Sequence, residues 1–299
     1  MPVLTDASAA ADIARLLVAM RPRLHRYCAR MVGSVIDGED VLQDALIKAV
    51  EAQATSGAVA NPIANPEGWL FRIAHNTALD FLRRRNRQQA LHGDQEVDMV
   101  ADPLDAVTSR QIAGASLRTF MRLPVAQRSS VILMDVLGCS LQEMAKVMDC
   151  SLAAAKAALY RGRTQLRALA DEPEDTPQQK LSDADRAQLG AYVAHFNARD
   201  FDAIRAMIAD DVRLDLVNKT SLRGKAEVSR YFSNYSNVSD WHLVPGLIER
   251  HPAILVFDPN DRDSGPKYFM LLDWAAGKVA TIRDFRHAPY VIDGAEYRV

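Results

Sequence analysis

The chain has 299 residues, of which 48% are hydrophobic and 25% charged, and its net charge is only −2. This composition is typical of a globular protein of two or three domains, and no apolar run approaches the roughly 18–20 residues of a membrane-spanning helix. The N-terminus lacks a signal-peptide pattern and the three cysteines cannot all pair, so we expect a cytoplasmic protein with reduced thiols, no cofactor and no metal site.

The charge is unevenly distributed along the chain. Residues 1–92 carry 11 Lys and Arg against 9 Asp and Glu, and residues 112–170 carry 8 against 3. The connector 93–111 carries 1 against 5, and residues 171–299 carry 16 against 21. Two basic segments therefore flank an acidic connector, and the acidic remainder does not favour nucleic acid as a partner. An acidic module tethered to two basic ones could, however, cover them.

Two helices are predicted in the first 52 residues. Residues 12–33 carry apolar side chains at helical spacing, and Pro22 predicts a kink or a break there. In residues 38–52, acid and amide groups stand early in the helix, where the helix dipole favours them. The same stretch has an apolar face made of Val41, Leu42, Ala45, Ile47, Ala49 and Val50. Residues 53–66 contain small residues and two prolines, which indicates a loop.

A third amphipathic helix is predicted over residues 66–87, with Asn65 as its N-cap and Pro66 at its first helical position. Its polar face carries Arg72 and Asn76 and ends in a run of arginines. Such a run either offsets the dipole at the helix C-terminus or binds phosphate groups, and charge alone leaves both alternatives open. The polar, acidic residues 88–104 then indicate a flexible linker.

Residues 117–170 indicate a helix-turn-helix. A Leu-Pro break at 123–124 begins a helix that ends at Gly138, and Ser140 to Glu143 form a capping box for the next one. After a short turn, Ser151 can cap a last helix that ends near Leu169 and turns one side inward: Leu152, Ala155, Leu159, Leu166 and Leu169. A plain helical hairpin with a basic surface is the alternative.

The order of these segments is similar to that of a known family. EDVLQDALIKA resembles the part of region 2 of group 4 (extracytoplasmic-function, ECF) sigma factors that contacts the clamp helices of the largest RNA polymerase subunit. EGWLFRIAHNTALDFLRRRNR resembles the adjoining part that opens and reads the −10 promoter element. Residues 123–167 resemble region 4, whose helix-turn-helix reads the −35 element and which contacts the flap of the second-largest subunit.

The resemblance implies roles for individual residues. It assigns Asp40, Gln43 and Asp44 to core polymerase binding, and the 55–66 loop to a pocket for an extruded base. For the −10 DNA face it implies Arg72, Asn76, Arg83, Arg84 and Arg87. For the −35 element it implies Lys156, Tyr160, Arg161 and Arg163.

The predicted recognition helix departs from the family pattern. It carries Ala154, Ala157 and Ala158 where the family usually has hydroxyl and arginine side chains, and alanine cannot donate a hydrogen bond to a base or phosphate. Gly162 lowers the helix propensity by about 1 kcal/mol relative to alanine. We therefore expect −35 reading to be weak or to depend on Lys156, Tyr160 and Arg161.

From residue 183 onward the pattern changes to helices followed by strands, which predicts an α+β domain. Helices are expected around 189–196, 201–208 and 225–235, and a strand at 212–217. Further apolar runs, which predict antiparallel hairpins, cover residues 241–248, 253–257, 268–274 and 278–287.

The segments FNARDFDAIRAMIADDVRLD, GKAEVSRYFSNY and IRDFRHAPYV resemble the SnoaL-like branch of the NTF2-like fold, a cone with a curved antiparallel sheet and a pocket. Because relatives of this fold include isomerases and cyclases as well as non-enzymatic modules, the fold does not decide the function. If the domain were an isomerase, the candidate catalytic groups would be Asp215, Asp273, Asp284 and His287, with Tyr231, Tyr268 or Trp241 as pocket walls. Candidate pocket residues are Asp215, Tyr231, Trp241, Tyr268, Asp273 and His287.

We therefore predict a non-enzymatic sigma factor that binds core RNA polymerase and promoter DNA and is regulated in cis by its C-terminal domain. The alternatives are a ligand-sensing helix-turn-helix regulator, and an isomerase or hydrolase with a DNA-binding arm. Two all-α sigma domains and one α+β domain are expected. Their boundaries are 10–90 for region 2, 91–111 for a linker, 112–170 for region 4, 171–182 for a second linker and 183–299 for the SnoaL-like domain.

Overall fold

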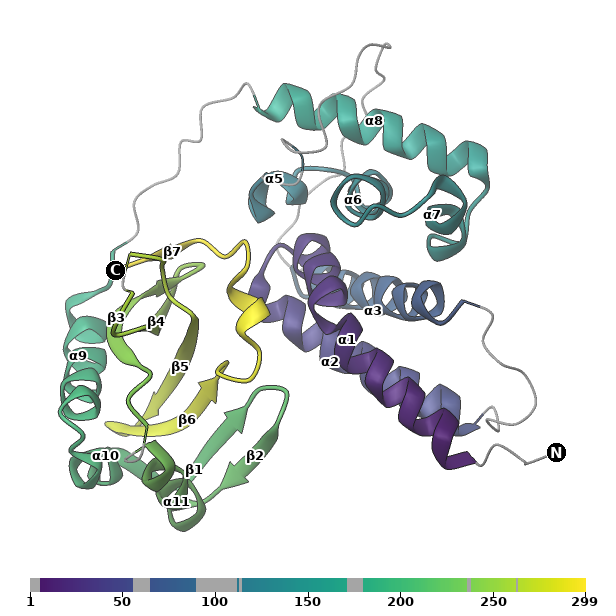
Figure 1. Ribbon diagram of the computed structural model, residues 1–299. Coiled ribbons are helices and arrows are strands. Elements are labelled where there is room, and N and C mark those ends of the chain that lie inside the picture. Colours follow the sequence, from purple (N-terminus) through teal and green to yellow (C-terminus); the bar gives the residue numbers. More distant parts are fainter. Residues whose placement is uncertain are drawn as a thin grey trace. The chain divides into compact units, whose positions relative to one another are not determined.

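The computed structural model describes residues 6–55, 65–89, 112, 115–170, 180–235, 238–261 and 263–299. The chain divides into two compact units, residues 1–174 and 175–299, each of which is described by itself (Figure 1). The predicted linker 91–111, and most of the predicted loop 55–66 and linker 171–182, lie outside the described residues.

Three long helices begin the first unit: α1 (Asp6–Val32), α2 (Val35–Thr55) and α3 (Pro66–Gln89). Helix α1 continues through Pro22, so the break predicted there is not present. The carbonyl that loses its partner belongs to Val18, whose side chain is 66% exposed, so water can bond to it. Asn65 caps α3 as predicted, because its Oδ1 accepts from the amide of Gly68 at 2.9 Å.

The second half of this unit is built from short helices. After α5 (Leu117–Met121), helix α6 (Val125–Val131) continues as a π-helical segment, η2 (Ile132–Val136), where the sequence predicts one regular helix. Helix α7 (Leu141–Val147) begins with the predicted capping box, in which Ser140 and Glu143 bond to each other's backbone amides. Helix α8 (Leu152–Ala170) follows, with the amide of Ala154 donating to Ser151 Oγ at 3.1 Å.

Close packing of α8 on α6 explains why residue 162 is a glycine. A Cβ at this position would lie 2.9 Å from the carbonyl oxygen of Gln127 and 2.7 Å from Val131 Cγ2, both in α6. The glycine therefore lets α8 approach α6 closely, and this packing offsets its low helix propensity. Leu152, predicted to face inward, is instead 49% exposed, whereas Ala155 in the same turn is buried as predicted.

The second unit is an α+β fold, as predicted. Its elements in chain order are α9 (Asp183–Asn197), α10 (Phe201–Met207), β1 (Ile208–Leu216), β2 (Thr220–Arg223), α11 (Lys225–Tyr235), β3 (His242–Ile248), β4 (His251–Phe257), β5 (Tyr268–Ala275), β6 (Lys278–Asp284), η3 (Pro289–Ile292) and β7 (Tyr297–Arg298). Among the described residues, seven strands form one sheet in the order β2-β1-β6-β5-β4-β3-β7. The predicted hairpins β3–β4 and β5–β6 are antiparallel, whereas β1 and β6 pair in parallel. The short strands β2 and β7 were not predicted from the sequence.

An aromatic cluster joins the helices of this unit to the curved sheet. Phe196 of α9 stands at its centre, with ring contacts to the surrounding aromatic side chains: Tyr192, Phe201, Phe232, Tyr235 and Trp241. Edge-to-face ring pairs of this kind contribute about 0.5–1.5 kcal/mol each beyond their buried area. Helix α9 packs on β3 and β4, and α11 packs on β1 and β2, which positions α11 beside a pocket described below.

Candidate functional site

The first candidate surface is the exposed side of α2. Asp40, Gln43 and Asp44 are exposed there, and Ile47 and Val50 are 51% and 53% exposed. The placement of Ile47 and Val50 on the apolar face was therefore wrong: spacings of four and seven residues from Gln43 put them on its side of the helix.

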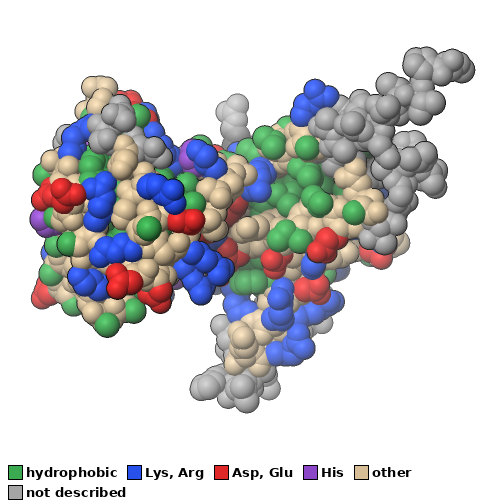
Figure 2. Space-filling model, turned by 90° about the horizontal axis from the view of Figure 1, so that it is seen from below, with side chains coloured by type: hydrophobic (Ala, Val, Ile, Leu, Met, Phe, Trp, Pro, Cys, Tyr) green, Lys and Arg blue, Asp and Glu red, His purple; other side chains and the backbone are tan. Residues whose placement is uncertain are grey.

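Figure 2 shows hydrophobic side chains gathered on the part of the surface where α1 and α2 lie, beside acidic ones. An exposed surface that combines acidic and large apolar side chains is typical of a protein–protein contact. We call the exposed side of α2, from Asp40 to Val50, the α2 stripe.

Helix α3 carries a second, basic surface. Asn76, Arg83, Arg84 and Arg87 are exposed. Arg83 pairs with Asp80 at 3.3 Å and Arg84 approaches Asp44 at 4.0 Å, and the side chains in both pairs are about half exposed or more. Exposed ion pairs contribute only about 0–1 kcal/mol, so these guanidinium groups can exchange a carboxylate for a phosphate at little cost.

Arg85, in the middle of the same run, has a different role. Its Nη1 donates to the carbonyl oxygen of Val32 at 2.9 Å, and its guanidinium lies 5.7 Å from the centre of the Phe81 ring. It therefore binds the last carbonyl group of α1, at the negative end of the helix dipole. The arginine run combines one structural residue with neighbours that face outward.

Helix α8 carries the third surface. Lys156, Tyr160 and Arg161 are exposed, as their predicted role requires. Arg163 instead forms a bidentate pair with Asp135, at 2.9 Å (Nε to Oδ2) and 2.5 Å (Nη2 to Oδ1), and the Asp135 side chain is 2% exposed. The hydrogen bond to Asp135 raises the pKa of Arg163. Arg163 therefore fastens α8 to η2, and the lone acid Asp135 in an apolar run was the available sequence signal.

A buried polar cluster joins α1, α3 and α6, and we call it the Tyr27 cluster. The Tyr27 hydroxyl lies 2.7 Å from His75 Nδ1 and 2.8 Å from Ser129 Oγ, and all three side chains are buried. Burial lowers the pKa of His75 to about 4 and raises the pKa of Tyr27, so both side chains stay neutral. The sequence analysis did not identify this contact between the two helical modules.

Arg128 of α6 strengthens the same junction. Its guanidinium donates to the carbonyl of Met31 at the end of α1, at 2.5 Å, and to carbonyls of the α5 region. Those carbonyls belong to Phe120 at 2.9 Å, Met121 at 3.2 Å and Leu123 at 2.9 Å. Burial lowers the pKa of Arg128 to about 10, which still leaves it charged near neutral pH. A buried cation is thus satisfied by backbone oxygens of both modules.

An ion pair at the surface connects α3, which carries the predicted −10 DNA face, to the helix-turn-helix that is predicted to read the −35 element. Arg72 Nη2 of α3 lies 3.0 Å from Asp149 Oδ1, in the turn between α7 and α8. Asp149 has a φ of 52°, so the turn is a tight one, and its side chain is 77% exposed. In this arrangement the turn of the helix-turn-helix lies against the predicted −10 face of α3.

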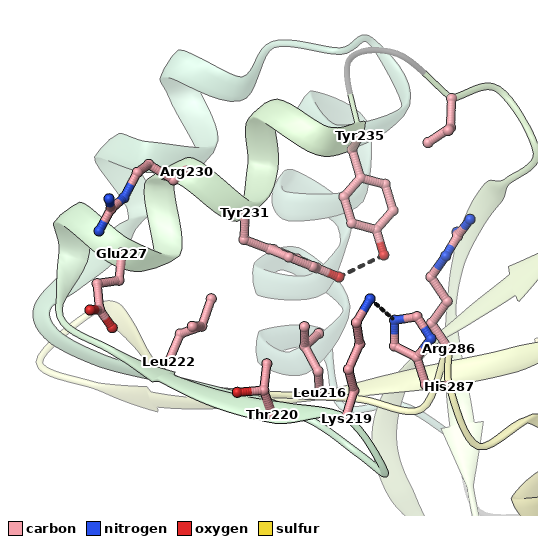
Figure 3. A pocket seen from close by; sticks show the side chains of 11 residues that line it. Leu216, Lys219, Thr220, Leu222, Glu227, Arg230, Tyr231, Tyr235, Arg286 and His287 are labelled. Atoms are coloured by element: carbon pink, nitrogen blue, oxygen red, sulfur yellow. Dashed lines mark hydrogen bonds between the residues drawn. The ribbon is translucent and has the colours of Figure 1, made fainter.

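The second unit contains a cavity of about 530 Å³ (Figure 3). Leu216 and Leu222 of β1 and β2 form one side, α11 covers another, and Lys219, Arg286 and His287 stand at one end. The complete lining is Leu216, Lys219, Thr220, Leu222, Glu227, Arg230, Tyr231, Tyr235, Val238, Arg286 and His287.

Of the six predicted pocket residues, Tyr231 and His287 line this cavity. Asp215 bonds to Ser221 at 3.1 Å, and the Tyr268 hydroxyl accepts from Arg286 at 2.9 Å. Trp241 is buried in the aromatic cluster and Asp273 is exposed on β5, so these four residues lie outside the lining. Six lining residues with functional groups were not predicted: Lys219, Thr220, Glu227, Arg230, Tyr235 and Arg286.

Asp284, at the end of β6, is fully buried behind the tyrosines. It accepts hydrogen bonds from the hydroxyls of Tyr231 and Tyr235, the latter at 3.0 Å, and from the amide of Arg286 at 2.8 Å. Burial raises the pKa of this carboxyl group. Because Asp284 does not line the cavity, its position favours holding Tyr231 and Tyr235 over abstracting a proton from a bound molecule.

Two further findings concern the described residues as a whole. None of the helices they form is long and apolar enough to cross a membrane. They also contain no group of three or more His, Cys, Asp or Glu side chains that could hold a metal ion.

Comparison with known proteins confirms the resemblances. Residues 16–88 match sigma-70 region 2, residues 117–166 match sigma-70 region 4 and residues 189–250 match the SnoaL-like domain. The ECF RNA polymerase sigma factor SigG of Mycobacterium tuberculosis is 29% identical over 298 residues, which cover 89% of this chain and 78% of SigG.

Two other curated relatives match the sigma regions. SigW of Bacillus subtilis is 29% identical over 175 residues, covering 54% of this chain and 89% of SigW. SigM of Mycobacterium tuberculosis is 31% identical over 147 residues, covering 49% of this chain and 71% of SigM. Both are ECF RNA polymerase sigma factors. The chain therefore belongs to the ECF sigma factors of RNA polymerase and carries a C-terminal SnoaL-like domain.

Proposed function

We propose that this sigma factor binds the clamp helices of core RNA polymerase through the α2 stripe. The observation that carries this proposal is the composition of the stripe: Asp40, Gln43 and Asp44 precede two large apolar side chains that are about half exposed. Acidic groups steer the encounter with a basic partner, while burial of the apolar pair adds about 25 cal/mol per Å². Binding to core polymerase would place the activity in the cytoplasm.

We assign the binding of promoter DNA to the two basic surfaces, on α3 and α8. On α3, Asn76 and the exposed arginines would contact the −10 element, and Arg72 would join them once its pair with Asp149 opens. On α8, Lys156, Tyr160 and Arg161 would contact the −35 element. Arg163 is left out of the DNA contacts because its guanidinium is held by Asp135. The flap of the second-largest polymerase subunit is the expected partner of the remaining surface of region 4.

The arrangement of the first unit supports a closed, inactive state. The Tyr27 cluster and Arg128 hold the two sigma modules together, and Asp149 occupies Arg72 of the predicted −10 face. A polymerase-bound sigma factor has to present both surfaces to DNA at once, so this junction would open on binding. The C-terminal unit would act in cis by shifting the balance between closed and open states.

Transcription in vitro tests the polymerase contact. The variant Ile47→Asp places a charge in the α2 stripe, and Val18→Asp makes the matched change on α1, at a residue that is 66% exposed. With core polymerase and a pool of promoter fragments, Ile47→Asp should reduce both co-purification with core and transcript yield by at least about tenfold. Val18→Asp should leave both near the wild-type value. Equal activity of the wild type and Ile47→Asp would contradict the proposed contact.

The same assay addresses regulation. A truncation after residue 175 removes the second unit at the boundary between the two compact units. The transcript ratio between this truncation and the full chain gives the sign of the C-terminal effect. Identical yields on every promoter, together with identical distances between the sigma modules in solution, would contradict control in cis.

A further inference from the structure

The cavity of the second unit combines an apolar wall with an excess of positive charge. Its lining includes Lys219, Arg230 and Arg286 against a single carboxylate, Glu227. We propose that this cavity binds a small organic monocarboxylate with an apolar body, its carboxylate at Lys219 and its body between Leu222 and Tyr231. The proposal concerns the second unit and does not depend on the assignment of the polymerase or DNA contacts.

The apolar part of the site lies between β2 and α11. Leu216 and Leu222 rise from the strands, and the Tyr231 ring projects from the helix above them (Figure 3). The hydroxyl of Tyr231 is directed to Tyr235, 2.7 Å away, and to Asp284, so the ring presents carbon atoms to the cavity. A volume of about 530 Å³ is within the range of pockets that enclose small organic ligands.

No carboxylate among the described residues forms an ion pair with Lys219, at one end of the cavity. Lys219 Nζ lies 3.3 Å from His287 Nε2, and burial together with the charge of Lys219 lowers the pKa of His287. The imidazole is then a neutral acceptor, and the Lys219 ammonium, which has three donors, has donors to spare. Figure 3 shows Lys219 and His287 directed toward each other below the tyrosines, which leaves the ammonium at the end of the apolar wall.

The two arginines of the lining, Arg230 and Arg286, differ in the ion pairs that they form. Arg286 donates to Asp240 at 2.6 Å and to the Tyr268 hydroxyl at 2.9 Å, so its charge is already balanced. Arg230, in the middle of α11, makes no ion pair with any described residue and lies near Glu227 in the lining. The uncompensated charge at the His287 end of the cavity is therefore that of Lys219. A single ammonium charge is balanced by one carboxylate, whereas a multiply charged phosphate would bring excess negative charge.

Binding measurements on the full-length protein test the proposal. Isothermal titration calorimetry would compare a panel of aryl and medium-chain carboxylates with the primary amide of each, and 2-naphthylacetate with 2-naphthylacetamide is one such pair. At least one acid should bind, and at least about tenfold more tightly than its amide, because a charge-assisted hydrogen bond is lost. Inorganic phosphate should bind more weakly than this acid, because it lacks the apolar body.

Matched variants locate the site. Lys219→Met should remove the preference for the acid and leave binding of the amide unchanged. Lys225→Met is the control, since Lys225 pairs with Asp210 at 3.8 Å and is not in the lining. The proposal is overturned if no carboxylate binds, if acids and amides bind equally, if phosphate binds as tightly as the best acid, or if both lysine variants have the same effect.

Discussion

Each unit of this protein contains a buried network centred on tyrosine, and the two networks differ in composition. In the Tyr27 cluster, a hydroxyl, a neutral imidazole and a serine satisfy one another within 2.7–3.3 Å. In the second unit, Tyr231 and Tyr235 donate to Asp284, a carboxyl group in a fully buried position. The first network holds two modules together, whereas the second forms the wall of a cavity.

The difference has a physical consequence for motion. The neutral Tyr27 cluster can separate without stranding a charge, because water can replace each hydrogen bond at a net cost of about 1 kcal/mol. Arg128 at the same junction would lose its bond to Met31 but keep its bonds to carbonyl groups of the α5 region. A network built on a buried carboxyl group is costly to disrupt, because the acid needs its donors. We therefore expect the first unit to open at its junction and the second to keep its pocket rigid.

The largest effect is expected at Arg128, a charged group that is buried at the junction. Arg128→Met removes a cation that serves the carbonyls of Met31, Phe120 and Leu123, and should lower the free energy of unfolding of the first unit by about 3–5 kcal/mol. Urea unfolding followed by ¹⁹F NMR of 5-fluorotryptophan separates the units, since Trp69 lies in the first and Trp241 and Trp274 in the second.

Arg122→Met is the matched control for this experiment, because Arg122 is exposed. It should shift the Trp69 midpoint by less than about 0.5 kcal/mol. A similar shift for both variants would show that the contacts of Arg128 are not what stabilises the junction.

Lowering the pH should change the free energies of unfolding of the two units in opposite directions. Burial lowers the pKa of His25 and of His75 from 6.5 to about 4, so the unfolded chain binds protons that the folded one does not. The contribution of these two histidines to the free energy of unfolding of the first unit is constant above pH 6.5. It decreases between pH 6.5 and about 4 by about 1.4 kcal/mol per pH unit for each histidine. Burial raises the pKa of Asp284 instead, so over the window between 3.8 and the raised value acidification stabilises the second unit.

The Trp69 and Trp241 signals, followed in urea at several pH values, measure these opposite slopes. His75→Gln should flatten the dependence of the first unit on pH. A Trp69 midpoint that stays constant from pH 6.5 down to about 4 would contradict the lowered histidine pKa values.

A smaller effect is expected when each tyrosine network loses one hydroxyl. Tyr27→Phe leaves His75 and Ser129 3.3 Å apart, able to bond to each other, so the cost should be about 1–2 kcal/mol. Tyr231→Phe leaves Asp284 with Tyr235 and a backbone amide, which predicts a similar cost to the second unit. Spin-label distances between α3 and α8 should broaden for Tyr27→Phe alone, and equal broadening in both variants would remove the proposed distinction.

The smallest effect is expected for the Arg72–Asp149 pair, whose side chains are 50% and 77% exposed. A double-mutant cycle with Arg72→Ala and Asp149→Ala should give a coupling energy below about 1 kcal/mol that decreases with added salt. In transcription assays, Asp149→Ala should raise activity slightly because it frees Arg72, while Arg72→Ala should lower it. A loss of activity in both variants would indicate that Asp149 serves another purpose.

The sequence by itself determined the local structure and the fold class. Helix ends at Asn65, Ser140 and Ser151 agree with the prediction because a cap needs only its own side chain and an amide within three residues. The α+β character of the second unit followed from hydrophobic periodicity, which is also local. The motif order identified the sigma regions for the same reason.

Contacts between residues far apart were decided by the tertiary structure alone. Tyr27 meets Ser129 across 102 positions and Lys219 meets His287 across 68, and no local pattern encodes such pairs. Arg163 and Arg85 carry the same charge as their exposed neighbours, but packing brings Asp135 and Val32 to them and makes them structural. Likewise Ile47 is exposed because α2 turns its other side to α1 and α3. A side chain's role at these positions depends on which face is buried, and only the packing of distant elements settles that.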